Sequence, residues 1–70
     1  RKRRIEMATI NGQQVDIKNT SLLDYIVSNG FDADRLAVEV NGDIVKRGTY
    51  GDYIINEYDK IEIVCFVGGG

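Results

Sequence analysis

The sequence predicts an α+β roll in which one main helix packs on one face of a mixed sheet of about five strands. Three observations lead to this prediction. Two Asn-Gly pairs, Asn11-Gly12 and Asn41-Gly42, each lie between short segments in which apolar and polar residues alternate, as in β-hairpins. Between the two pairs, apolar residues recur at helical spacing. With 70 residues, the chain has room for one domain only.

The first hairpin is predicted to join strands at residues 7–10 and 13–17. A two-residue hairpin turn needs positive φ at both central positions, which Asn11 and Gly12 tolerate better than other residues. In the second strand, Val15 and Ile17 alternate with polar residues. Because successive side chains of a strand point to opposite faces, these two should share a face.

The helix is predicted to follow Ser21, whose hydroxyl can cap it, with Asp24 three residues later as in a capping box. Gly30 is placed to end the helix in a left-handed conformation, and Phe31 should pack back onto the core. The apolar residues at helical spacing are expected to cover one face of the sheet: Leu22, Leu23, Ile26 and Val27.

The second hairpin is predicted at residues 36–40 and 43–45, with alternate residues from Leu36 to Val40 on one face and Ala37 and Glu39 on the other. Residues 46–56 read as an irregular crossing, interrupted by Gly48 and Gly51. The apolar residues that could anchor a short helical turn there are Tyr50, Tyr53, Ile54 and Ile55.

The last predicted strand spans residues 61–67. One face would carry Ile61, Ile63, Cys65 and Val67, and the other Glu62, Val64 and Phe66. Cys65 would then be a small hydrophobe on the inward face. It is the only cysteine of the chain, which excludes an internal disulfide framework and fits a reducing, cytoplasmic compartment.

The composition argues against an enzyme. The chain has no histidine, which removes the commonest general base and the commonest metal ligand. One cysteine without histidine provides neither a nucleophilic Cys-His pair nor a zinc site. Asp32 and Asp34 are best explained as solvated turn and cap residues. We therefore predict no catalytic residues, no metal site and no bound cofactor.

The charge is unevenly distributed. Residues 1–4 are all basic, whereas the chain after Met7 has 5 basic and 10 acidic residues. We expect residues 1–7 to be a disordered leader or a cloning remnant, and residues 8–67 to form the domain. The acidic body would repel phosphates, so we expect no nucleic-acid partner, although a basic arm at residues 1–4 remains an alternative. We also expect no membrane partner, because no apolar run reaches the length of a membrane span.

The chain ends in a run of three glycines, Gly68 to Gly70, after Phe66 and Val67. A glycine run is slim and conformationally free, so it can enter a narrow channel of another protein. The terminal carboxylate is ionised at neutral pH, since its pKa is roughly 3.5. A carboxylate is a poor electrophile, so transfer chemistry would require a partner that activates it, most simply as an acyl-adenylate made from ATP. A frayed end or a cloning remnant is the alternative explanation.

Several motifs together carry a resemblance to a known family. They are Ile-Asn-Gly at residues 10–12, Ser-Leu-Leu-Asp at 21–24, Leu-Ala-Val-Glu-Val-Asn-Gly-Asp-Ile-Val at 36–45, Asp-Lys-Ile-Glu-Ile-Val at 59–64 and the terminal glycines. From Met7 to Gly70 the sequence resembles the thiamine-biosynthesis sulfur carriers, the ThiS family, which have a ubiquitin-like β-grasp fold. It departs from the family at Lys46, often Pro, at Tyr50, often Trp, and at Tyr58-Asp59, commonly Gly-Asp.

The resemblance implies a mechanism and partners. A ThiF-type adenylyltransferase would use ATP and magnesium to convert Gly70 to an acyl-adenylate. Sulfur from a cysteine desulfurase would displace AMP and leave a thiocarboxylate on Gly70, with Gly68 and Gly69 as the flexible tail. The thiazole synthase ThiG would take the sulfur into the thiazole ring of thiamine. Exposed apolar residues beside the tail, Val64, Phe66 and Val67, would form the docking patch.

Other functions remain open on the sequence alone. A sulfur carrier like the small subunit of molybdopterin synthase would use the same tail chemistry, but that subunit is usually longer. A carrier for cysteine synthesis or a tag that forms isopeptide bonds is also compatible. From a different class, the chain could be a β-grasp interaction module without tail chemistry, which would tolerate residues after Gly70. We expect the free chain to be monomeric.

Overall fold

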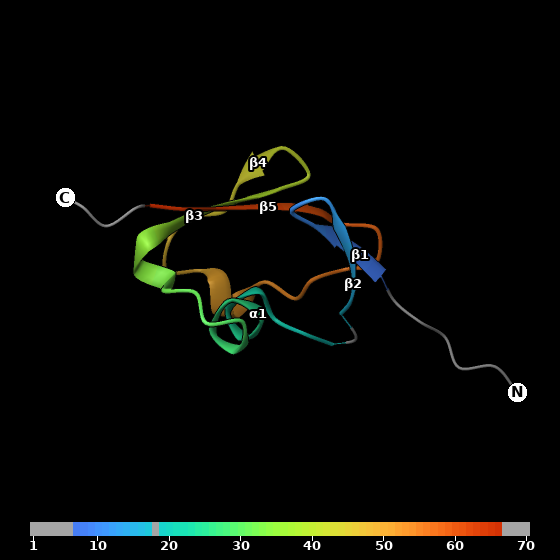
Figure 1. Cartoon of the computed structure of the whole chain (residues 1–70), viewed down its shortest axis with the longest axis horizontal. Coiled ribbons are helices and arrows are strands. Elements are labelled where there is room, and N and C mark those ends of the chain that lie inside the picture. Colours follow the sequence, from blue (N-terminus) through green and yellow to red (C-terminus); the bar gives the residue numbers. More distant parts are fainter. Residues whose placement is uncertain (1–6, 18, 67–70) are drawn as a thin grey trace, which may run out of the picture.

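The computed structural model describes residues 7–17 and 19–66. In this part of the chain five strands form one sheet, and α1 (Leu22–Ser28) packs across one of its faces (Figure 1). The strands are β1 (Met7–Ile10), β2 (Gln13–Asp16), β3 (Leu36–Val40), β4 (Asp43–Ile44) and β5 (Lys60–Cys65). Two short 3₁₀ turns are η1 (Ala33–Arg35) and η2 (Tyr50–Asp52). The predicted α+β roll with one main helix is confirmed.

The last strand lies in the middle of the sheet, whose order is β2-β1-β5-β3-β4. β5 pairs in parallel with β1, where Thr9 lies opposite Lys60 and Ile10 opposite Ile61. On its other side β5 pairs antiparallel with β3 over five residue pairs. The two hairpins flank this strand: β1 pairs with its first two residues, Lys60 and Ile61, whereas β3 pairs with it from Ile61 to Cys65.

Both Asn-Gly pairs form the predicted hairpin turns. The φ angles are 51° and 83° at Asn11 and Gly12, and 54° and 91° at Asn41 and Gly42. Positive φ at both central residues is the geometry of a type I′ turn, whose twist matches that of the flanking strands. β2 and β4 each end one residue earlier than predicted, at Asp16 and Ile44.

Helix α1 has the predicted caps. The Ser21 hydroxyl accepts a hydrogen bond of 3.0 Å from the Asp24 backbone N–H. At the other end Gly30 has φ of 81°, and its N–H donates to the Val27 carbonyl while the Phe31 N–H donates to the Ile26 carbonyl. This pair of bonds is a Schellman motif, which satisfies carbonyls that the end of a helix leaves unpaired.

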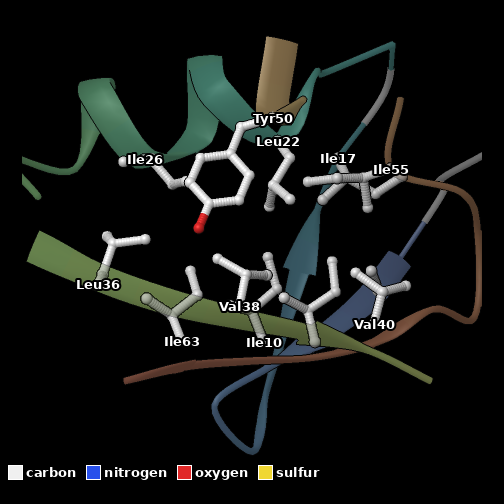
Figure 2. Packing of buried hydrophobic residues seen from close by; sticks show 12 residues of the cluster. Ile10, Ile17, Leu22, Ile26, Leu36, Val38, Val40, Tyr50, Ile55 and Ile63 are labelled. Atoms are coloured by element: carbon white, nitrogen blue, oxygen red, sulfur yellow. The ribbon is translucent and has the colours of Figure 1, made fainter. Parts of the chain in front are cut away.

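The core lies between α1 and the sheet, and Figure 2 shows Leu22, Ile26 and Tyr50 above the strand residues. Phe31 packs against it, as predicted. Val27 does not: its side chain is 62% exposed, because a helix of two turns presents only one narrow face to the sheet. The buried apolar residues are Ala8, Ile10, Ile17, Leu22, Ile26, Leu36, Val38, Val40, Tyr50, Ile55, Ile61 and Ile63.

The irregular crossing between β4 and β5 is tied to the start of α1. The Leu22 N–H donates to the Tyr53 carbonyl at 2.8 Å, and the Ile55 N–H donates to the Thr20 carbonyl at 2.9 Å. The short helical turn predicted there is η2, and it buries Tyr50. The sequence did not predict η1, which Asp32 caps by accepting the Asp34 N–H at 2.9 Å.

Candidate functional site

The end of β5 is the described part of the chain closest to the glycine run. The strand begins at Lys60, one residue before its predicted start, and ends at Cys65. Beyond it, the Phe66 N–H donates to the Arg35 carbonyl at 2.8 Å, which continues the attachment to the segment before β3 by one residue. The backbone is therefore anchored by hydrogen bonds as far as Phe66. The predicted carrier residue Gly70, the tail residues Gly68 and Gly69, and the docking residue Val67 lie outside the described residues.

Two predicted docking residues lie at this end, and both are exposed. Val64 is 59% exposed and Phe66 is 50% exposed. Val64 lies opposite Ala37, and because it alternates with the buried Ile61 and Ile63 along β5, it is on the face of the sheet that points away from the core. Alternation along a strand made this orientation predictable.

The sequence analysis did not predict a third exposed apolar side chain in this region, that of Ile44. Ile44 of β4 is 75% exposed and lies opposite Glu39 of β3. The signal was present in the sequence: with the turn at Asn41-Gly42, a two-residue loop pairs residue 39 with residue 44 and places both on one face.

These residues border an open groove on the outer face of β3, β4 and β5. Its volume is about 440 Å³. The lining combines apolar side chains with three charged ones and comprises Ala37, Val38, Glu39, Gly42, Ile44, Lys60, Glu62 and Val64.

Two carboxylates face each other in this groove. Glu39 and Glu62 are direct partners across β3 and β5, and both are exposed. Lys60 lies on the same side of β5, two residues before Glu62. Among residues 7–17 and 19–66, no ion pair joins a cation to either glutamate.

A buried carboxylate lies at the opposite end of β5 and has a structural role. Asp59 is only 6% exposed. It accepts hydrogen bonds from the Asn41 side-chain amide at 2.9 Å, the Tyr53 hydroxyl and the Asn56 N–H at 2.8 Å. The Asn41 oxygen in turn accepts the Lys60 N–H at 2.9 Å. The cluster joins the second hairpin turn, the irregular crossing and the first residue of β5.

The same contacts shift two pKa values. Burial raises the pKa of Asp59, but the hydrogen bonds from Tyr53, Asn56 and Asn41 outweigh burial, so the pKa of Asp59 lies below its ordinary value. Burial, together with the hydrogen bond to Asp59 and its negative charge, raises the pKa of Tyr53 to about 12. Neither group lies beside the tail, so we assign the cluster to stability.

The prediction for Cys65 is wrong. Its backbone is in register with the buried Leu36, as the alternation required, but its side chain is exposed. Cys65 is the last residue of β5, four residues beyond Ile61, where the pairing with β1 ends, so no paired strand flanks Cys65 on that side.

Two further findings concern cofactors and membranes. In the described part of the chain, no three His, Cys, Asp or Glu residues come together as a metal site. None of the helices described is both long and apolar enough to cross a membrane.

Comparisons with known proteins extend these observations. The model of the ThiS family matches residues 6–70. The chain is 40% identical over 62 residues to a thiazole synthase of Magnetococcus marinus. The matched segment makes up 87% of this chain but only 19% of the length of that relative. It is 31% identical to the protein ycf40 of Porphyra purpurea, over 87% of each.

A solved structure shares the fold. It is the thiamine biosynthesis protein (ThiS) from Geobacter metallireducens, with a TM-score of 0.72 and 22% sequence identity over 91% of this chain and 99% of that one. The mixed five-stranded sheet with one helix is therefore the ubiquitin-like β-grasp fold expected from the sequence motifs.

Proposed function

We propose that this chain, which belongs to the ThiS family, is a sulfur carrier of thiamine biosynthesis that acts through the C-terminal carboxylate of Gly70. The observation that carries the proposal is the family match, which continues through the glycine run to residue 70. In this proposal the chain is a protein co-substrate and not an enzyme, and it acts in the cytoplasm.

The first step is activation of the carboxylate by a partner. An oxygen of Gly70 attacks the α-phosphorus of ATP on a ThiF-type adenylyltransferase, with magnesium held by that enzyme, and pyrophosphate leaves. The terminal sulfur of a persulfide on a cysteine desulfurase then attacks the acyl carbon, AMP leaves, and a thiol reductant cleaves the S–S bond of the resulting acyl disulfide. The product is a thiocarboxylate, whose charge lies largely on a soft and nucleophilic sulfur.

The fold suits a carrier of this kind. The end of β5 is paired with β3 as far as Cys65, and the Phe66 N–H donates to the Arg35 carbonyl, so the chain is anchored up to Phe66. Beyond this anchor, slim glycines can enter an enzyme channel that side chains would block. The body supplies recognition through the surface beside the tail, where Val64 and Phe66 are exposed.

The acceptor that we propose is a thiazole synthase. The support is the Magnetococcus marinus relative, which carries a segment 40% identical to this chain within a longer polypeptide of that name. A domain and an enzyme joined in one chain commonly act in one process, so we expect the separate chain to serve the same enzyme.

The decisive experiment is intact mass spectrometry after incubation with a ThiF-type adenylyltransferase, ATP, magnesium and a sulfur source. We expect a mass gain equal to exchange of one oxygen for sulfur, localised to Gly70 by fragmentation. The thiocarboxylated product should then support thiazole formation by thiazole synthase, which a molybdopterin-type carrier would not.

The matched controls alter the terminus alone. Amidation of Gly70, or deletion of Gly69 and Gly70, should abolish the mass gain while the circular dichroism spectrum stays unchanged. If a chain extended beyond Gly70 acquires the sulfur without first being trimmed, the proposal is wrong.

A further inference from the structure

We propose that the outer face of β3, β4 and β5 binds the body of the thiazole synthase through a cationic side chain of that enzyme, which is held between Glu39 and Glu62 and flanked by apolar contacts. This inference rests on the proposed function, because it names the partner surface that accompanies transfer from Gly70. It goes beyond the apolar patch expected from the sequence, since its central element is a pair of like charges.

The apolar part of this face is otherwise unexplained. Ile44 is 75% exposed and Val64 is 59% exposed, and both line the same groove. Isolated exposed apolar side chains are common, but several beside one groove mark a binding surface. The register places Ile44 opposite Glu39 and places Val64 two residue pairs further along β5 than Glu62, on the same face. Apolar side chains therefore border the two carboxylates on two sides.

The two glutamates give the face its chemical preference. Residues directly opposite each other across antiparallel strands have Cβ atoms about 5 Å apart, and like charges at such positions are unfavourable. Lys60 lines the same groove but forms no ion pair with either glutamate in the described part of the chain, so two carboxylates face one cation. A guanidinium placed between two carboxylates can donate to both, and its planar shape also stacks well on apolar surface. An arginine of the partner would thus relieve a repulsion that the free carrier retains.

The position of the glycine run in the chain indicates which partner would supply the arginine. Gly70 follows Cys65, the last residue of β5, by five residues, and a fully extended chain of five residues spans at most about 18 Å. An enzyme that receives this carboxylate in its active site must cover the same end of the molecule. The thiazole synthase relative that contains a matching segment makes this enzyme the partner of choice.

The test compares two double variants that each remove two negative charges. Glu39→Gln with Glu62→Gln changes the groove, whereas Asp24→Asn with Asp52→Asn changes exposed carboxylates on α1 and η2, away from the groove. Binding of each unmodified chain to purified thiazole synthase is measured by isothermal titration calorimetry. We expect the dissociation constant of the groove variant to be at least about tenfold higher than that of the wild type, as for loss of a charged hydrogen bond. Its affinity should also no longer depend on the salt concentration. The control variant should bind like the wild type.

Thermal melting separates a binding effect from misfolding. Because the groove variant removes a like-charge pair, its melting temperature should equal or exceed that of the wild type. Equal binding by the groove variant and the wild type would overturn the inference, as would a wild type that does not bind the synthase at all. Concentration-dependent sedimentation abolished by the groove variant would also overturn it, because the face would then join two copies of this chain.

The two proposals fail separately. Mass spectrometry of the same wild-type sample reports the sulfur exchange at Gly70 without any contribution from the synthase. If the exchange occurs but the groove variant binds normally, only the docking inference is wrong. If no exchange occurs with the adenylyltransferase, the carrier function itself is wrong.

Discussion

Asp59 shows how a single residue in a turn can connect distant parts of a small domain. Its carboxylate receives hydrogen bonds from residues 41, 53 and 56, which belong to the second hairpin turn and the crossing. The sequence indicated only a turn at this point. That the turn carboxylate is buried and shared by three donors depends on how the crossing returns to the sheet.

We predict that this cluster sets both pH limits of stability. The pKa of Asp59 is lowered by folding, so its contribution is complete above the unfolded pKa of roughly 3.9 and is lost as the pH falls below that value. The pKa of Tyr53 is raised to about 12, so its contribution is complete below about pH 10 and is lost as the pH rises towards 12. Urea denaturation across pH 2 to 12 measures both limits.

The matched variant is Tyr53→Phe. It removes the hydroxyl that donates to Asp59 and should cost about 1.5–3 kcal/mol of unfolding free energy at neutral pH, as for hydrogen bonds to charged groups. It should also flatten the alkaline decline, because no phenol remains to ionise at this position. An unchanged alkaline decline in this variant would show that another group is responsible.

At the scale of elements, the sequence predicts the positions of the hairpin turns more accurately than the lengths of the strands. Both Asn-Gly turns form, and their asparagines also serve β5: the Asn11 side-chain oxygen accepts the Ile63 N–H at 2.7 Å, and that of Asn41 accepts the Lys60 N–H at 2.9 Å. The turn before β5 is different. Tyr58 has φ of 72°, a conformation that a residue with a Cβ atom adopts at a cost.

We predict that Tyr58→Gly stabilises the domain. Glycine removes the cost of the left-handed conformation, about 1–2 kcal/mol, and loses about 0.5–1 kcal/mol to its greater freedom when unfolded. The Tyr58 side chain is 84% exposed, so little packing is lost. Chemical denaturation should show a net gain of about 0.5–1 kcal/mol. Tyr58→Ala retains a Cβ atom and should show no gain; if alanine stabilises equally, backbone strain is not the cause.

At the scale of the whole molecule, β5 holds the sheet together and presents the tail from the same strand. Its inward residues close the core between the two hairpins, and its outward residues line the groove. The residues of the core and those of the proposed docking surface therefore alternate along one strand and point to opposite faces of the sheet.

We predict that truncations on the two faces differ sharply. Ile61 is fully buried, and Ile61→Ala should cost about 2–5 kcal/mol, which is comparable with the whole stability of a domain of this size. Val64→Ala on the exposed face should change stability by no more than about 0.5 kcal/mol. Urea denaturation followed by circular dichroism measures both. Similar losses in the two variants would contradict the assignment of the faces.

The sequence by itself determined the local features of this protein. Asn-Gly turns, a capped helix, the alternation within each strand and the motifs of the family all depend on neighbouring residues, and β1 and β3 have the predicted bounds. The candidate tail, too, is a property of the sequence. The predicted docking residues Val64 and Phe66 could be placed on one face of the last strand from the sequence. The alternation of side chains along a strand does not depend on which strand lies beside it.

The tertiary structure decided which side chains the opposite layer covers and which residues meet across strands. Cys65 and Val27 have the spacing of buried residues but are exposed: Cys65 is at the end of β5, beyond the pairing with β1, and Val27 is on the side of a short helix that does not face the sheet. The pairing of Glu39 with Glu62 requires β5 to lie antiparallel beside β3. The burial of Asp59 accompanies the placement of β5 beside β1, where the partners Ile10 and Ile61 are 51 residues apart in the chain. Local periodicity sets the direction of a side chain, whereas its surroundings depend on contacts between segments far apart in sequence.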